Sequence, residues 1–176
     1  MKLGDLYALM RKGPLGPLDY TIAFPQANTV KTIWGIIDLV ASGVGTTNEL
    51  HSAISSDAAM RMSDRQVRYY ADAARYLGML DKSGTNYILT DIGRLFSTSD
   101  SQTRTTIFIS QLSGMRSVFD LTLEYLLHNR FPDQESLQKA MTADDVMGKN
   151  DSEGDTVVRR AECLEAWLQW LTAQVD

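Results

Sequence analysis

The fold is decided by residues 63–78, which read SDRQVRYYADAARYLG. A serine followed three residues later by a glutamine has the spacing of a capping box, in which each side chain accepts a hydrogen bond from the other residue's backbone N–H. Apolar side chains then recur at helical spacing: Val67, Tyr70, Ala71, Ala74 and Leu77. Gly78 suits the left-handed position that follows many helices. These residues predict an amphipathic helix over 63–77 whose other face, with Arg65, Arg68, Tyr69, Asp72, Arg75 and Tyr76, points toward solvent or a ligand.

Two further helices are predicted before this one. The first follows Asn28, a suitable N-cap, and stops at Gly43. Its apolar face consists of Val30, Ile33, Trp34, Ile37 and Val40. The second is short and begins at Thr46 or Thr47, because Thr46 and Glu49 also have the capping-box spacing.

A β-hairpin is predicted after Gly78. The apolar segments 79–80 and 87–89 flank a polar turn at 81–86, and Thr90 can cap a following helix. A helix, a short helix, a longer helix and a hairpin, in this order, are typical of a winged helix-turn-helix. The fold class that we expect is therefore mainly α with a small β-hairpin.

The chain is expected to have three parts: an irregular N-terminal lead over 1–23, a winged helix domain over 24–98 and a helical C-terminal module over 99–176. Helices are predicted over 103–128, where Gly114 either divides or weakens the helix, after Asp133 and from Thr156. The helix from Thr156 has apolar residues at the same positions as helix 63–77, at an offset of 94 residues. Either the module is a degenerate second helix-turn-helix, or the similarity is a chance one between amphipathic helices.

Composition excludes several classes of protein. The 176 residues carry a net charge of −5, and the longest apolar runs are too short to cross a membrane. Cys163 is the single cysteine, which excludes an internal disulfide, and with two histidines it offers no metal cage. No signal peptide is visible, so we expect a cytoplasmic protein. No nucleotide loop or catalytic constellation occurs, so we expect no cofactor and no enzyme activity.

The helix 63–77 is the predicted recognition helix for double-stranded DNA, because the second helix of such a motif enters the major groove. Arg65 suits guanine and Gln66 suits adenine, whereas the other basic residues suit phosphates. Residues 61–94 contain six basic and four acidic side chains, a local charge of +2. The full set predicted to contact DNA is Arg61, Ser63, Arg65, Gln66, Arg68, Tyr69, Arg75, Lys82, Thr85, Asn86, Arg159 and Arg160.

The C-terminal helix carries weaker signals. Trp167 and Trp170 are expected to pack in a core or an interface. Arg159 and Arg160 either contact a second phosphate or pair with the acidic residues that precede them.

Several local patterns are shared with a known group of domains. They are Ile33-Trp34-x-Ile36-Ile37, Thr47-x-Glu49-Leu50, Arg65-Gln66-x-x-Tyr69-Tyr70-x-x-Ala73-x-x-Tyr76-Leu77-Gly78 and Tyr87-x-Leu89-Thr90-x-x-Gly93. Because of these patterns, the segment 24–95 resembles a winged helix domain attached to, or encoded beside, bacterial restriction-modification and related defence proteins. The resemblance implies DNA recognition, with cleavage or modification by a nuclease or methyltransferase partner or another domain.

Two other functions are consistent with the same residues. A dimeric transcriptional repressor would pair through helix 103–128 and the tryptophan helix, as a homodimer whose recognition helices lie about 34 Å apart. A protein–protein interaction adaptor would use the winged helix only as a scaffold, and an exposed apolar patch would mark its surface.

Overall fold

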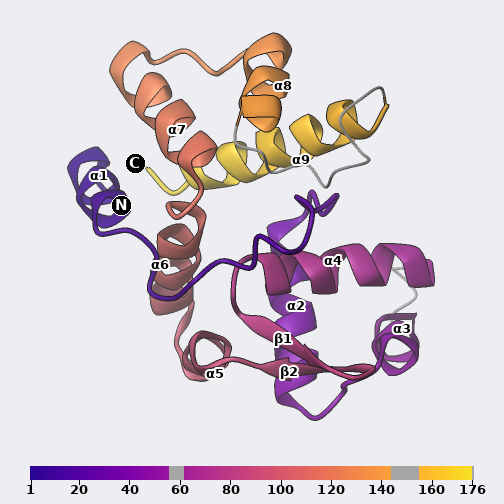
Figure 1. Cartoon of the computed structure of the whole chain (residues 1–176). Helices are drawn as coiled ribbons and strands as arrows, with labels where there is room; N and C mark the ends of the chain where they lie inside the picture. The colour runs from indigo at the N-terminus through magenta and orange to yellow at the C-terminus, as the bar shows by residue number, and fades with distance from the viewer. Residues whose placement is uncertain (56–61, 144–154, 176) are drawn as a thin grey trace.

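The computed structural model describes residues 1–55, 62–143 and 155–175 (Figure 1). Within these residues the chain is mainly helical with one two-stranded antiparallel hairpin, which confirms the expected fold class. The elements in chain order are α1 (Leu3–Arg11), α2 (Val30–Ala41), α3 (Thr47–Ser55), α4 (Asp64–Tyr76), β1 (Leu80–Ser83), β2 (Asn86–Leu89), α5 (Asp91–Thr98), α6 (Ser101–Leu112), α7 (Arg116–His128), α8 (Gln134–Ala143) and α9 (Asp155–Thr172).

The predicted order of three helices and a hairpin is confirmed over α2, α3, α4, β1 and β2. Both predicted capping boxes form, one between Thr46 and Glu49 at the start of α3 and one between Ser63 and Gln66 at the start of α4. The prediction for α2 was wrong in one detail, because its N-cap is Thr29 and not Asn28. Side chains of α9 hydrogen-bond the backbone N–H and C=O of Ala27, the residue before Asn28. The backbone is still extended at Thr29, and the helix begins after it.

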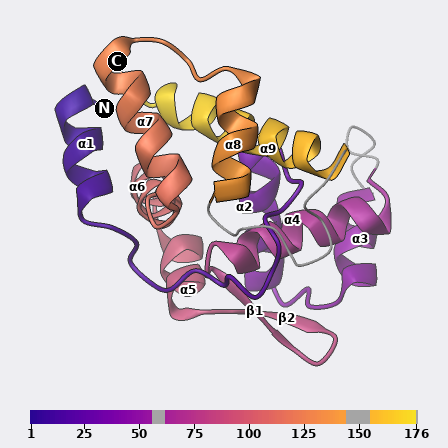
Figure 2. The same ribbon diagram turned by 45° about the horizontal axis from the view of Figure 1, so that its top comes forward.

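The hairpin pairs Leu80 with Leu89 and Ser83 with Asn86, and Gly84 makes the turn with a φ of 61°. Thr46 forms an antiparallel bridge to Asn86 on the other edge of β2. The segment before α3 therefore extends the hairpin toward a third strand and fixes its position beside α3 and α4. Figure 2 shows the tip of the hairpin reaching beyond the helices.

The helical segment predicted over 103–128 is divided into α6 and α7 with Gly114 between them, which is the first of the two expected effects of this glycine. The helix predicted to begin at Thr103 begins two residues earlier, at Ser101. The reason is local: the Asp100 carboxylate accepts a hydrogen bond from the backbone N–H of Thr103 at 2.8 Å and caps α6.

The N-terminal lead is packed into the molecule. After α1, which contacts α6 and α7, the chain crosses between α6 and the end of α4 (Figure 1). The buried side chain of Gln111 holds this crossing. Its Oε1 accepts from the N–H groups of Leu15 and Gly16 at 2.9 and 3.2 Å, and its Nε2 donates to the Leu77 carbonyl at 2.7 Å. One amide thereby joins the lead, α4 and α6.

One hydrophobic cluster includes residues from the lead, the α2–α5 region and the C-terminal helices. The Phe24 ring lies 5.2 Å from that of Trp167 and 5.6 Å from that of Tyr76, measured between centroids. The prediction that Tyr76 faces solvent was wrong, because the side chain is 1% exposed beneath the lead. Trp170 packs against Trp34, so both tryptophans of α9 have the packing role expected of them.

Candidate nucleic-acid interface

The first turn of α4 is exposed and tightly capped. The hydroxyl of Ser63 accepts from the Gln66 N–H at 3.3 Å, and the Gln66 Oε1 accepts from the Ser63 N–H at 2.9 Å and the Ser63 hydroxyl at 3.1 Å. Both residues, predicted as DNA contacts, are at the surface as expected. The Gln66 carboxamide oxygen, however, is already used within the protein.

Arg65 and Tyr69 form a pair along the exposed side of α4. The Arg65 Nε–H donates to the Tyr69 hydroxyl at 2.5 Å, and the guanidinium carbon lies 5.3 Å from the centroid of the tyrosine ring. Arg65 is exposed and Tyr69 is half-buried. A flexible side chain that is stacked and hydrogen-bonded in this way has fewer conformations to lose when it binds a ligand.

His51 connects α3 to the start of α4, a role that the sequence did not predict. Its Nε2 lies 2.7 Å from the Met62 carbonyl oxygen, and its Nδ1 lies 3.0 Å from the Asp64 carboxylate. Both partners are hydrogen-bond acceptors, so the ring can donate to either of them. No local spacing links residue 51 to residue 64, because the contact depends on how the two helices turn against each other.

The hairpin places a second basic group beside α4. Lys82 is exposed on β1, and its Nζ lies 5.4 Å from the centroid of the Tyr87 ring. Burial raises the pKa of the Tyr87 phenol, and the Asp72 carboxylate raises it further, whereas a hydrogen bond with the Thr47 side chain and the charges of Arg75 and Arg68 lower it. Tyr87 is thus a junction among α3, α4 and the hairpin.

Arg68 is exposed on α4, close enough to the hairpin for its charge to act on Tyr87. The predicted wing residues Thr85 and Asn86 are exposed at the turn of the hairpin. In Figures 1 and 2, α3 and the hairpin lie beside α4 at the end of the molecule opposite α7. The structure therefore brings Arg65, Arg68 and Lys82 to neighbouring elements at one end of the protein.

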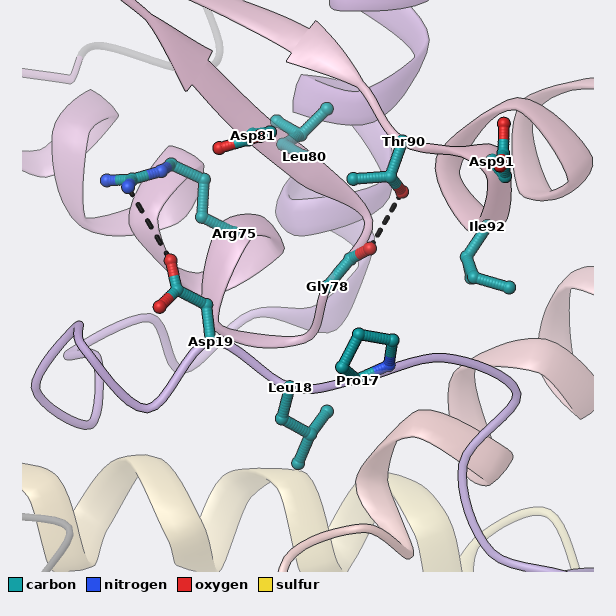
Figure 3. A pocket seen from close by; sticks show the side chains of 10 residues that line it. All are labelled: Pro17, Leu18, Asp19, Arg75, Gly78, Leu80, Asp81, Thr90, Asp91 and Ile92. Atoms are coloured by element: carbon teal, nitrogen blue, oxygen red, sulfur yellow. Dashed lines mark hydrogen bonds and ion pairs between the residues drawn. The ribbon is translucent and has the colours of Figure 1, made fainter.

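Arg75 was predicted to hold a phosphate, but the structure gives it other partners. Its side chain is 18% exposed and forms ion pairs with Asp72 at 3.1 Å and with Asp19 of the lead at 3.6 Å. Figure 3 shows Arg75 directed toward Asp19 at a pocket of about 390 Å³. Asp81 and Asp91 also line this pocket, so three carboxylates and one guanidinium give it a negative character that repels phosphate.

The other residues predicted to contact DNA, Arg61, Arg159 and Arg160, differ in where the structure places them. Arg61 lies outside the described residues. Arg159 is exposed on α9, whereas Arg160 is only 5% exposed. A phosphate contact by Arg160 is therefore incompatible with this conformation. The cause is the rotation of α9 about its own axis, which places Arg160 and the adjacent Ala161 on the buried side of the helix.

Other chemistry has little support in the described part of the chain. No group of three or more histidine, cysteine or acidic side chains is placed there to hold a metal ion. Cys163 is buried, its Sγ accepts from the Ala27 N–H at 3.2 Å, and burial raises the pKa of its thiol to about 12. Cys163 is thus a packing residue and not an accessible nucleophile.

None of the described helices combines the length and apolar character needed to cross a bilayer.

These observations define the class: a mainly helical protein with a small antiparallel hairpin and exposed basic residues on the hairpin and the adjoining helix. Residues 36–176 match the family described as a domain of unknown function (DUF7226), and the chain belongs to this family. No curated protein and no solved structure matches the chain.

Proposed function

We propose that this chain binds double-stranded DNA through α4 and the hairpin. The observation that carries the proposal is a set of three exposed basic side chains, Arg65, Arg68 and Lys82, none of which forms an ion pair with a described residue. Free cations on adjacent elements can replace the counterions of DNA phosphates, which supply much of the affinity of such complexes.

The order of the elements also supports the proposal. In a helix-turn-helix, the second helix of the motif enters the major groove with its N-terminal residues nearest the bases, and α4 occupies this position after α3. Ser63 and Arg65 are then near base edges or adjacent phosphates, and Lys82, Thr85 and Asn86 of the hairpin are placed for the DNA backbone. Arg75 and Arg160 are left out of this proposal.

The setting follows from the sequence resemblance. We propose that the chain is the DNA-recognition part of a restriction or defence system in the cytoplasm and has no catalytic activity of its own. Cleavage or modification then belongs to another domain or to a nuclease or methyltransferase partner. The assignment to a defence system rests on analogy at the level of the fold, and the DNA-binding experiment does not depend on it.

The test is binding of the full chain to random-sequence duplex DNA at about 50 and 200 mM salt, where each phosphate contact contributes about 0.9 to the slope of log affinity against log salt. Arg68→Ala is expected to lower the slope by about this amount. Arg75→Ala is the matched variant on the same helix, and its slope is expected to remain that of the wild type, because Asp19 and Asp72 already neutralise its charge.

Arg116→Ala controls for the loss of an arginine elsewhere. This residue is 85% exposed at the first position of α7, outside α4 and the hairpin. It is expected to leave the slope unchanged. If the wild type does not bind at 50 mM salt, or if Arg68→Ala retains the full slope, the proposed surface is wrong and the adaptor hypothesis is favoured.

A further inference from the structure

The capping box restricts what Gln66 can recognise. A glutamine that reads adenine must donate from Nε2 and at the same time accept at Oε1. The Gln66 Oε1 has two lone pairs, and it already accepts from the backbone N–H and the hydroxyl of Ser63. Adenine recognition by Gln66 would therefore require its Oε1 to give up at least one of these two bonds.

The contacts of Arg65 have the opposite effect. A guanidinium has five N–H donors, one on Nε and two on each Nη. The Nε–H is taken by the Tyr69 hydroxyl, and the ring of Tyr69 lies against the guanidinium. Within the described residues, Nη1 and Nη2 have no hydrogen bond or ion pair. Four N–H groups therefore remain free, and among them the end-on pair, one N–H on each Nη, fits two acceptors on one planar edge.

In the major groove, guanine is the base that presents two acceptors, O6 and N7, on one edge. We propose that Arg65 is the base-reading residue of α4, that its target is a guanine, and that Tyr69 is a positioning residue that holds the guanidinium for this contact. Gln66 is then a cap and has no part in base reading. This inference rests on the proposed DNA-binding function.

The structure supports a positioning role for Tyr69 through two separate contacts. The hydroxyl occupies the Nε–H donor of Arg65, and the guanidinium carbon lies over the ring, 5.3 Å from its centroid. Tyr69→Phe removes the first contact and keeps the second. Because neither tyrosine nor phenylalanine is charged, this change separates base preference from phosphate attraction.

The experiment selects a preferred site from a randomised duplex pool with the full wild-type chain, then measures affinity for that site and its single-base variants. We expect one position where guanine is favoured about tenfold to a hundredfold over the other bases. Arg65→Ala is expected to abolish this preference at that position alone. Tyr69→Phe is expected to reduce it severalfold while the salt slope stays that of the wild type.

Gln66→Ala is the matched variant in the same turn. It is expected to lower the thermal unfolding temperature, since the capping box is lost, but to keep the guanine preference. Unfolding measured for every variant excludes loss of fold as the cause of a change.

The inference is overturned if Gln66→Ala loses a base preference that Arg65→Ala retains, or if Tyr69→Phe discriminates as the wild type does. Salt-dependent binding of random DNA without a guanine position would overturn this inference and leave the proposed function intact. Absence of any salt-dependent binding would overturn both.

Discussion

Gly78→Ala tests whether the N-terminal lead is packed on the end of α4. Gly78 has a φ of 68°, a left-handed conformation that costs an alanine about 1–2 kcal/mol. A Cβ at this position would also lie 2.2 Å from the Pro17 carbonyl oxygen, a distance at which the lead has to move. The same segment is held to α4 by the Asp19 N–H, which donates to the Tyr76 carbonyl at 2.9 Å.

The cost is therefore larger than that of the backbone conformation alone. If the displaced lead loses the hydrogen bond between Asp19 and Tyr76, the buried groups left unpaired add about 1–3 kcal/mol. We expect Gly78→Ala to lower the free energy of unfolding by about 3 kcal/mol. For a protein of this size, that is a fall in melting temperature of roughly 6–12 °C.

Gly84→Ala is the matched control. Gly84 has a φ of 61° in the hairpin turn, but a Cβ there would have no atom within 4 Å. This variant should lower the free energy of unfolding only by the cost of the left-handed conformation, about 1–2 kcal/mol. Urea unfolding followed by circular dichroism measures both changes. Equal losses would refute the reasoning, because they would show that the lead does not cover Gly78. The pairing of Asp19 with Arg75 would then lose its structural basis too.

Three further predictions concern other elements. The backbone N–H of Thr103, and then its side chain, lower the pKa of Asp100 from 3.8. Because the folded pKa lies below the unfolded one, this stabilisation is complete above about pH 4 and is lost as the pH falls through the folded value. Asp100→Asn, which still caps the helix, should flatten the acid side of a plot of unfolding free energy against pH. Cys163, with its thiol pKa raised to about 12 by burial, should resist a thiol reagent at pH 8 until urea unfolds the chain. Trp167→Ala should lower the unfolding free energy by about 3–5 kcal/mol, because it removes a fully buried ring and its bond to Ala27.

The parts of the fold that the sequence predicts well have local causes. Ser63 and Gln66 are three residues apart, so their capping box can be read from the chain without knowledge of its surroundings. The same is true of Thr46 with Glu49, and of Gly78 after α4. These signals lie within one helical turn of the feature they determine. They explain why α3, α4 and the hairpin occur where they were expected.

The candidate site could be predicted only in part, because exposure depends on contacts between distant segments. Arg75 and Tyr76 have the spacing of a solvent face on an isolated α4, but the lead covers this side of the helix. The apolar residues of the lead, including Leu18 and Ile22, are a signal that it packs on something, since so many would be costly to leave in water. Their spacing does not identify the helix that they cover.

The number of free cations that the structure describes on α4 and the hairpin also limits how tightly this surface of one copy can hold DNA. If Arg65, Arg68 and Lys82 all contacted phosphates, the salt slope would be about 2.7, and affinity would fall roughly 40-fold between 50 and 200 mM salt. Proteins with six to ten such contacts lose about 10³–10⁵ over that range. A fall near 40-fold is therefore the most that these three residues supply, and it is about 12-fold when Arg65 contacts a base and only Arg68 and Lys82 contact phosphates. A fall of a thousandfold or more would require cations beyond these three, from a second copy bound to the same site or from elsewhere in the chain. Because the whole chain carries a net charge of −5, we favour the first result and a partner that supplies the remaining affinity.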